Sequence, residues 1–515
     1  MTDLLEITDH SAETATKPRV GFVSLGCPKN LVDSEVMMGM LDKAGAEITG
    51  QAETADILVV NTCSFIDRAK QESVDAILEM ARLKTAGSAQ KLIVAGCLVE
   101  RYRDEIRKNI PEVDAVVGTG ELESILEAAG FSRPSAPAVP SPFNILSNSQ
   151  AQVRPGREAL AGTHQPEGFR PEGDRREEQG RFSRAEWDGA TAALPQYLYD
   201  HTTPRLRTTK GASAYIKIAE GCDHPCSFCV IPNLRGKFRS RRFESVVAEA
   251  EQLVAEGVRE ITLIGQDTTC YGEDLGIKDG LAFLLERLAK IEDLKWVRFL
   301  YAYPNKVTQK LLDTIAEHDA LVKYIDMPLQ HASGPVLKRM KRGANGDIFL
   351  KLLERIRRTI PGIAIRTSFI VGFPGETEED FLVLEDFVRA ARIDWLGVFS
   401  YSDEEGAAAF NLDSALKVPK RTIESRRRRL MKLQQKISAK SRAAWVGRDF
   451  DVLVEGESEE TELLWEGRTL LHAPEIDGKV FINDFGPHET LVPGTFYRAQ
   501  ITESHQYDIV ARIVE

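Results

Sequence analysis

Apolar, β-branched segments of strand length alternate with amphipathic helical segments through most of this chain of 515 residues. A first block contains the runs RVGFVSLG, DILVVNT, KLIVAG and DAVVG, and a second block contains six runs between AYIKIA and WLGVFSY. Such alternation predicts parallel strands joined by covering helices. We therefore expect an N-terminal parallel α/β domain, followed by six βα units that fit an open, partial TIM barrel.

Two further segments have a different composition. Residues 132–204 are rich in proline, glycine, serine and charged residues and have no sustained apolar period, which is typical of a linker without a packed core. Residues 441–515 contain short apolar runs divided by turn residues, as in a small antiparallel β-barrel. The expected domains are a tail at 1–17, the α/β domain at 18–131, a disordered linker at 132–204, the six-unit barrel at 205–440 and the small barrel at 441–515.

Three of the seven cysteines lie within the short stretch EGCDHPCSFC: Cys222, Cys226 and Cys229. They directly follow the first predicted barrel strand, and the carboxyl ends of barrel strands are where such folds place their chemistry. Three thiolates are one ligand short of a closed zinc or iron–sulfur site. A cluster held by three cysteines keeps one open iron, which is typical of a reactive metal. The alternative is a zinc site completed by His224, although a ligand inside so short a loop would strain that geometry.

A second set of cysteines is dispersed along the N-terminal domain. Cys27, Cys63 and Cys97 lie in LGCPKN, NTCSF and AGCLVE, each just after a predicted parallel strand. Because the carboxyl ends of parallel strands meet at one edge of a sheet, we expect these thiols to converge on a second site with an open position. Cys270 belongs to neither set and is expected to be a packing residue.

The cysteine content and the apolar pattern limit the class of protein. Seven cysteines are too few for a disulfide scaffold of this length, and reduced thiols indicate metal or redox use. The N-terminus MTDLLEITDH lacks a signal-peptide pattern, and no apolar run is long enough to span a bilayer. We expect a cytoplasmic protein without a membrane partner.

Polar and glycine residues at other barrel strand ends are candidate pocket residues. Gln266 and Asp267 follow the second barrel strand, and Arg366 lies in the fifth, where a buried guanidinium requires an anionic partner. Further candidates follow the fourth and fifth strands, and they are Gln330, His331, Gly372, Gly375 and the capping-box pair Thr377 and Asp380. Each of them is also compatible with an ordinary turn.

The two cysteine sets, together with NTCSF, EGCDHPCSFCVIPNLRGKFRSR, MPLQHAS and GFPGETEEDF, resemble the methylthiotransferase family within the radical S-adenosylmethionine (SAM) enzymes. The resemblance covers roughly residues 18–131 and 205–515. It implies an N-terminal three-cysteine domain, a radical SAM barrel and a C-terminal TRAM domain. It also implies two [4Fe-4S] clusters, SAM bound at the open iron of the second cluster, two SAM molecules for each product, and an electron donor protein.

The resemblance assigns roles to particular residues of this chain. Cys27, Cys63 and Cys97 would hold the first cluster, and Cys222, Cys226 and Cys229 the second. Phe228 matches the family's aromatic position beside the cofactor. By their places at the barrel mouth, Gln266 and Asp267 are expected at the methionine amine of SAM, and Arg366 at its carboxylate.

The family has two substrate branches. One modifies a tRNA adenosine, and the other, of RimO type, methylthiolates the β-carbon of an aspartate on small-subunit ribosomal protein twelve. The stretch GCPKNLVDSE resembles the RimO type, since the tRNA branch more often has Gln-Met-Asn after the cysteine.

Charge provides an independent indication of the branch. Residues 445–515 carry 15 acidic and 5 basic side chains, so they repel phosphate backbones and suit a basic ribosomal protein. We therefore predict the RimO type, with a tRNA methylthiotransferase and a non-enzymatic iron–sulfur module as alternatives. Candidate contacts to ribosomal RNA are Arg235, Lys237, Arg239, Arg241, Arg242 and residues 426–429.

Overall fold

The computed structural model describes residues 17–132, 197–209, 211–458, 461 and 463–515. Residues 1–131 and 194–515 form one unit by their contacts, and every element described below belongs to it. Most of the expected tail and residues 133–196 of the expected linker lie outside the described residues. The carboxyl end of that linker is packed, because Tyr199 is buried under the guanidinium of Arg241, at 4.2 Å from the ring centroid. The expected disorder is therefore wrong for residues 197–204.

The N-terminal domain is a parallel sheet covered by helices, as predicted. Its strands are β1 (Arg19–Ser24), β2 (Glu47–Thr49), β3 (Ile57–Thr62), β4 (Lys91–Gly96) and β5 (Ala115–Val117), in the order β2-β1-β3-β4-β5. Its helices are α1 (Pro28–Lys43), α2 (Asp67–Ala86), α3 (Cys97–Asn109) and α4 (Ser124–Ala129). From β1 the chain adds β2 on one side of the sheet and β3, β4 and β5 on the other, so the strand order switches between β1 and β3. The crevice at such a switch point is where doubly wound folds bind ligands.

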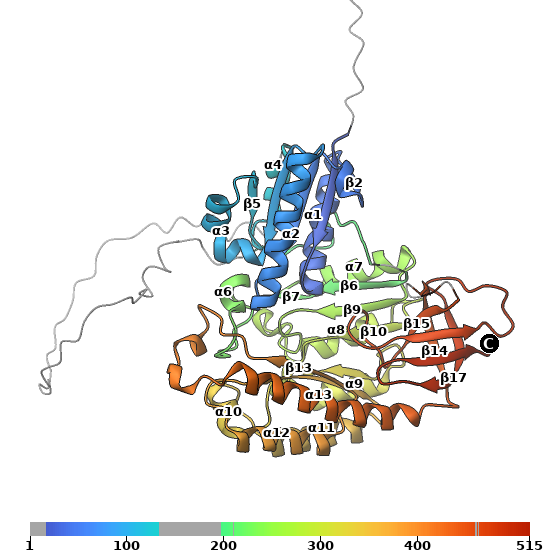
Figure 1. Ribbon diagram of the computed structural model, residues 1–515. Helices are drawn as coiled ribbons and strands as arrows, with labels where there is room; N and C mark the ends of the chain where they lie inside the picture. Colours follow the sequence, from blue (N-terminus) through green and yellow to red (C-terminus); the bar gives the residue numbers. More distant parts are fainter. Residues whose placement is uncertain (1–16, 133–196, 210, 459–460, 462) are drawn as a thin grey trace, which may run out of the picture. The chain divides into compact units, whose positions relative to one another are not determined.

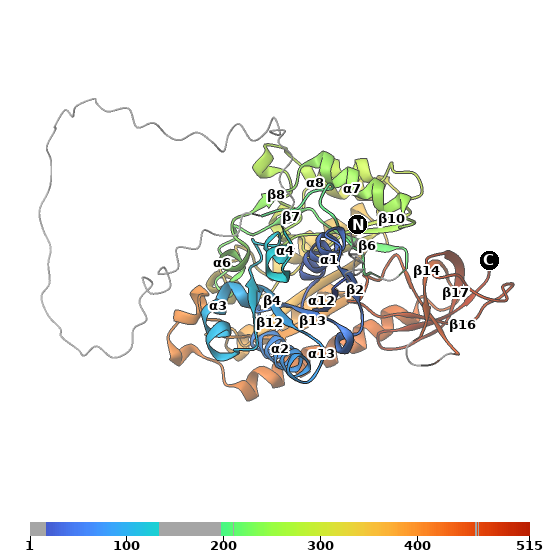
Figure 2. The same ribbon diagram turned by 90° about the horizontal axis from the view of Figure 1, so that it is seen from above.

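The second part is a half-barrel of six parallel strands, which confirms the predicted six βα units. Its strands are β6 (Ser213–Lys217), β9 (Glu260–Ile264), β10 (Trp296–Phe299), β11 (Tyr324–Asp326), β12 (Ala364–Val371) and β13 (Trp395–Ser400). Figure 2 shows β6, β10, β12 and β13 from above. They form two three-stranded sheets, β10-β9-β6 and β11-β12-β13, which a single parallel bridge between Val297 and Leu321 connects.

Helices cover the outer face of the half-barrel. They are α7 (Phe243–Ala255), α8 (Gly280–Leu288), α9 (Gln309–Glu317), α10 (Gly334–Arg339), α11 (Gly346–Thr359), α12 (Glu378–Ala391) and α13 (Lys420–Ala443). Alternate strand residues such as Ile261, Leu263, Phe369 and Val371 enter one buried apolar cluster with these helices. Of the described helices, not one combines the length and apolarity required to cross a bilayer.

The C-terminal part is a closed five-stranded barrel. Its strands are β14 (Asp449–Glu457), β15 (Trp465–Thr469), β16 (Val480–Asp484), β17 (Phe496–Ser504) and β18 (Ile509–Ile513), in the order β14-β15-β16-β18-β17. All its ladders are antiparallel except the β16–β18 pair.

The small barrel contacts the amino ends of the half-barrel strands. Arg468 forms an ion pair of 2.7 Å with Glu260 at the start of β9. The indole N–H of Trp395, the first residue of β13, donates to the carbonyl of Leu471 at 2.8 Å. The N-terminal domain contacts the opposite, carboxyl ends of the half-barrel strands, where the chemistry was expected; Lys29, for example, donates to the carbonyl of Gly265 directly after β9.

Candidate metal centres and cofactor pocket

The structure brings together Cys27, Cys63 and Cys97 of the N-terminal domain. Cys27 precedes α1, Cys63 follows β3, and Cys97 begins α3 directly after β4. Burial, helped by the neighbouring thiols of Cys63 and Cys27 and opposed by the charge of Arg235, raises the pKa of the Cys97 thiol to about 12. Such mutual influence requires proximity, so three thiols distant in sequence meet at one sheet edge. Their number and softness fit an iron–sulfur cluster.

Two glycines allow the cysteine-bearing turns of this first site. Gly26 has φ +94°, and a Cβ there would lie 2.8 Å from Cβ of Cys63. Gly96 also has φ +94°, and its Cβ would lie 2.3 Å from Oδ1 of Asn61. A left-handed backbone so close to its neighbours excludes other side chains, so each glycine positions the cysteine that follows it.

Positive side chains lie beside the first site. Arg235 donates to Oδ1 of Asn30 at 2.6 Å, and it forms buried ion pairs with Asp33 and Glu220 at 3.0 and 3.1 Å. Burial alone would raise the pKa of Cys27, but the charges of Lys29 and Arg235, with two backbone hydrogen bonds, lower it below the ordinary thiol value. Since iron binds the thiolate, these cations favour the ligand form of Cys27.

The second set, Cys222, Cys226 and Cys229, lies on the loop after the short strand β7 (Ala219–Glu220). Burial raises the pKa of Cys222 to about 11 and that of Cys229 to about 12, and the thiol of Cys226 raises both. All seven cysteines of the chain are free thiols. This donor set also fits a cluster with one open position.

Arg342 and Tyr303 border the second site, and sequence reasoning did not identify either of them. The guanidinium of Arg342 donates to Sγ of Cys226 at 3.7 Å and to the carbonyl of Pro328 at 2.6 Å. It lies over the ring of Tyr303, at 4.2 Å from the centroid. Tyr303 follows strand β10 and Arg342 lies between helices α10 and α11, but neither residue lies in a recognisable motif.

A short helix links the two sites. Helix α6 (Ile231–Arg235) begins two residues after Cys229. Val230 and Leu234 pack with Cys97 in one buried cluster, and the hydroxyl of Thr119 donates to the carbonyl of Leu234 at 2.8 Å. The segment that carries the third cysteine of the second site therefore leads directly into contact with the first.

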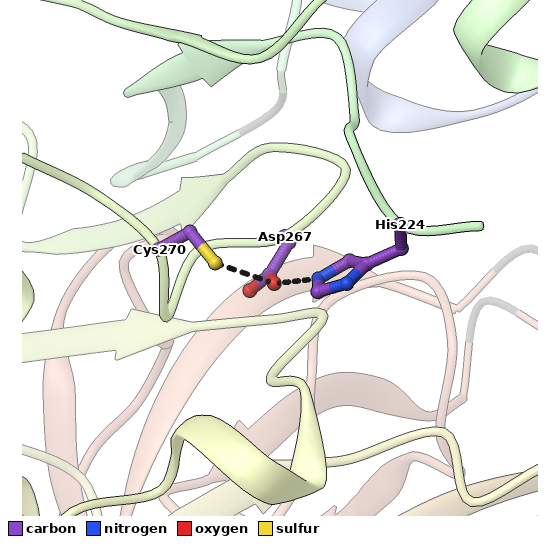
Figure 3. Close-up of side chains that lie close together, drawn as sticks. All are labelled: His224, Asp267 and Cys270. Carbon is purple, nitrogen blue, oxygen red and sulfur yellow. Dashed lines mark hydrogen bonds and ion pairs between the residues drawn. The ribbon is translucent and has the colours of Figure 1, made fainter. Parts of the chain in front are cut away.

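The predicted pocket residues Gln266 and Asp267 lie at the carboxyl end of β9, as expected. Gln266 donates to Glu220 at 2.7 Å, and its own Oε1 is buried without a hydrogen bond to any described residue. Asp267 is buried and contacts Nε2 of His224 at 2.5 Å and Sγ of Cys270 at 3.1 Å (Figure 3). Phe228 is half-buried against the apolar core of the half-barrel.

His224 and Cys270 differ from their expected surroundings. The imidazole of His224 stacks on Tyr303, with 3.8 Å between ring centroids, and it faces Asp267 (Figure 3). The thiol of Cys270 donates to Asp267 instead of packing only against apolar side chains. The ligand atoms of His224, Asp267 and Cys270 lie within 4.8 Å of one another. His224 is thus engaged with a carboxylate and an aromatic ring, which leaves the alternative of a zinc site completed by His224 without support.

Arg366 does not lie at the cysteine loop. It is the third residue of β12, near the amino end of the strand, and pairs with Asp326 at 2.8 Å and with Asp477 at 3.5 Å. Burial lowers and the two carboxylates raise the pKa of Arg366, and the net direction is upward. The anionic partner required by its burial exists within the chain, so the expected contact with the SAM carboxylate is wrong.

The turn after β12 is mainly structural. Glu376 accepts the backbone N–H groups of Gly372 and Phe373 at 2.6 and 3.2 Å and pairs with Arg426 at 2.8 Å. The predicted capping box of Thr377 and Asp380 is present at the start of α12.

Two other candidates from the strand ends differ in exposure. His331 is fully buried, and burial lowers its pKa to about 3. Gln330 is half-buried and has a left-handed backbone with φ +72°.

Part of the predicted RNA-contacting surface is buried. Arg235, Arg241 and Arg426 are at most 5% exposed, and each forms an ion pair with a glutamate. Buried guanidinium groups do not reach a phosphate backbone, so the expectation is wrong for these three arginines.

Three family models match successive parts of the chain. Residues 19–118 match the family described as "Uncharacterized protein family UPF0004", residues 216–388 match the radical SAM superfamily, and residues 446–514 match the TRAM domain. Each matched range falls within one of the three structural parts described above.

Curated relatives match the chain along nearly its full length. A protein of Koribacter versatilis named "Ribosomal protein uS12 methylthiotransferase RimO" is 69% identical over 97% of both chains. A protein of Solibacter usitatus with the same name is 58% identical over 96% of this chain and 95% of its own. Among solved structures, the radical SAM methyltransferase TsrM of Kitasatospora setae aligns with a TM-score of 0.46 and 18% identity, over 75% of this chain and 72% of its own.

Proposed function

Because this chain belongs to the ribosomal protein uS12 methylthiotransferase RimO family of radical SAM enzymes, we propose that it transfers a methylthio group to the β-carbon of an aspartate in uS12. The observation that carries the proposal is the adjacency of two three-cysteine sites. Helix α6 follows Cys229 and packs on Cys97. A substrate carbon at the mouth of the half-barrel is thereby close to both sets of thiols.

The chain's residues have separate tasks in this proposal. Cys27, Cys63 and Cys97 hold one [4Fe-4S] cluster, and Cys222, Cys226 and Cys229 hold the SAM-binding cluster. When bound, these cofactors supply the radical and sulfur chemistry, while the protein positions the substrate and excludes water. The buried ion pairs around α6 fix the position of one site relative to the other.

Four residues are proposed to lie beside SAM and orient it. Gln266 and Asp267 provide amide and carboxylate oxygens for its amine, since one buried oxygen of Gln266 has no hydrogen bond to the described residues. Arg342, beside Cys226, takes the role at the SAM carboxylate that was expected of Arg366. Phe228 remains the proposed aromatic neighbour of the cofactor.

The acidic C-terminal barrel is proposed to hold the basic substrate. It contacts the amino ends of the half-barrel strands, away from the cysteine loops. uS12 would therefore be held at two places, with its target loop in the mouth and its basic surface on the TRAM domain. Attraction between opposite charges accelerates association and is weakened by salt. An electron donor protein and ribosomal RNA remain proposed partners, and the proposed ribosomal substrate supports a cytoplasmic location.

The proposal is tested by offering the anaerobically reconstituted enzyme, with SAM and a reductant, either uS12 or unmodified tRNA. We expect the mass of a methylthio group to appear on uS12 only, and modification to slow as salt increases. Addition to tRNA alone would show that the substrate branch is the other one. Absence of SAM cleavage would instead favour the non-enzymatic iron–sulfur module.

A further inference from the structure

Lys29 connects the first cysteine site with the mouth of the half-barrel. It lies in the first turn of α1, two residues after Cys27, and is 8% exposed. Its ammonium group is 3.4 Å from the carbonyl oxygen of Gly265, the residue between β9 and Gln266. The side chain thus begins beside one site and ends beside the proposed SAM pocket of the other.

The ammonium group of Lys29 lies over the ring of Tyr301 in a cation–π contact. Nζ of Lys29 is 3.4 Å from the ring centroid. Tyr301 has a left-handed backbone with φ +65°, which is costly for a residue with a side chain. Its N–H donates to Asp326 at 3.0 Å and its carbonyl accepts from Thr268 at 3.2 Å. Such local strain, held in place by its neighbours, is typical of a functional position.

Lys29 forms no ion pair with a carboxylate among the residues that the structure describes, and its nearest anion is the thiolate form of Cys27, which the first cluster would bind. The neighbouring buried cations are satisfied, because Lys217 and Arg235 both pair with Asp33 and Glu220. Arg342 also has no carboxylate partner in the described part of the chain, but it contacts the thiol of Cys226. A hydrogen bond of 3.4 Å is long, and one aromatic ring replaces a counter-ion only partly. A buried ammonium group that has no carboxylate partner and reaches the mouth of the half-barrel is suited to bind a carboxylate brought there by a ligand.

The proposed substrate brings such an anion to this place. Methylthiolation of an aspartate β-carbon requires that carbon to lie between the two cysteine sites, and the side-chain carboxylate is bonded directly to it. We propose that Lys29 binds the side-chain carboxylate of the target aspartate and so selects aspartate over uncharged residues. The inference rests on the proposed function and extends it to the chemistry of substrate recognition.

The test compares three variants of the reconstituted protein. Lys29→Met removes the charge and keeps the chain length, Lys29→Arg keeps the charge, and Lys43→Met alters an exposed lysine of the same helix α1. Binding of two fluorescent uS12 peptides, with aspartate or asparagine at the target position, is measured anaerobically with SAM and without reductant. Iron and sulfide contents and thermal unfolding are recorded for each variant.

We expect the wild type and Lys43→Met to prefer the aspartate peptide. In Lys29→Met, affinity for the aspartate peptide should fall by roughly 30-fold or more, as for other buried charge pairs that lose one partner. Affinity for the asparagine peptide should change little, so the preference disappears. Lys29→Arg should retain most of the preference for the aspartate peptide.

Other outcomes overturn the inference in distinguishable ways. If Lys29→Met weakens both peptides equally, Lys29 does not recognise the carboxylate. If the preference remains but iron content falls, the ammonium group serves the first cluster instead. If the wild type modifies uS12 without distinguishing the two peptides in binding, only the role of Lys29 is rejected. If the wild type neither binds nor modifies uS12, the proposed function fails and this inference fails with it.

Discussion

The two cysteine sites offer the same donors, but the chain assembles them by different means. The second site takes Cys222, Cys226 and Cys229 from one loop of eight residues. The first takes Cys27, Cys63 and Cys97 from the ends of three strands and depends on the pairing of β1, β3 and β4. A loop can present its ligands with little help from the sheet, whereas the dispersed site exists only when the domain is folded.

The charges around the two sites also differ. At the first, Lys29 from the N-terminal domain and Arg235 from the half-barrel together lower the pKa of Cys27 against the effect of burial. At the second, burial raises the pKa of Cys222 and Cys229, and Arg342 offsets this only in part at Cys229. The positive charges beside the first site therefore come from both domains, whereas the positive charge beside the second site comes from the half-barrel alone.

The largest expected effect separates the sites by their ligands. Cys226→Ala should lose about half of the iron and all formation of 5′-deoxyadenosine, because the second cluster is the one proposed to bind SAM at its open iron. Cys63→Ala should also lose about half of the iron, yet still cleave SAM while it forms no methylthiolated product. Iron analysis and chromatography of the reaction check both, with Cys270→Ala as the control that retains all iron. If one substitution removed all iron, the two sites would not be independent.

A smaller effect tests the difference in charge. Arg235→Met leaves the buried carboxylates of Asp33 and Glu220 short of a partner and should cost about 3–5 kcal/mol, together with iron at the first site. Arg342→Met breaks no ion pair among the described residues, so it should cost about 1–3 kcal/mol and affect only the second site. Thermal unfolding and iron content measure both.

The control for these arginines is Arg287→Met, which breaks an exposed pair with Glu251 at 2.6 Å. A surface pair of this kind is worth about 0–1 kcal/mol. Equal losses for Arg235→Met and Arg342→Met would contradict the assignment of Arg235 as the charge shared between the domains.

A last comparison concerns the glycine that precedes a cysteine at each site. Gly96→Ala should impair the first site, and Gly221→Ala the second, where a Cβ would lie 2.1 Å from the carbonyl oxygen of Lys237. Placing alanine in the left-handed backbone region should by itself lower the free energy of unfolding by about 1–3 kcal/mol. Gly45→Ala measures that part, because Gly45 has φ +102° and open space around it. The comparison is weakened if Gly96→Ala and Gly221→Ala lose iron no faster than Gly45→Ala.

Much of the fold and the ligand set was predictable because the signals are local. Strands buried on both faces are continuous apolar runs, as in β3, and helices between them show their own period. The cysteines that follow strands were expected at sheet edges, and the structure brings both sets together there. The short edge strand β2 was missed, since three half-exposed residues carry no such pattern.

The charged residues were less predictable. In α1, Lys29, Asp33 and Glu35 were not recognised as buried, because their partners come from distant segments such as Arg205, which pairs with Glu35 at 2.5 Å. Arg235 was interpreted as a contact for RNA, although it pairs with Asp33, 202 positions away. Arg366 was assigned to a ligand, although Asp326 and Asp477 neutralise it.

The sequence by itself determined the order of the three domains, the two sets of cysteines and the acidic character of the last domain. These properties depend on residue type, on spacing along the chain and on the period of the apolar residues. Only the tertiary structure decided which buried charges are paired with a carboxylate and which, like that of Lys29, have no such pair among the described residues. The physical reason is that an ion pair forms between side chains that packing brings together, and packing joins residues whose separation in the sequence carries no signal.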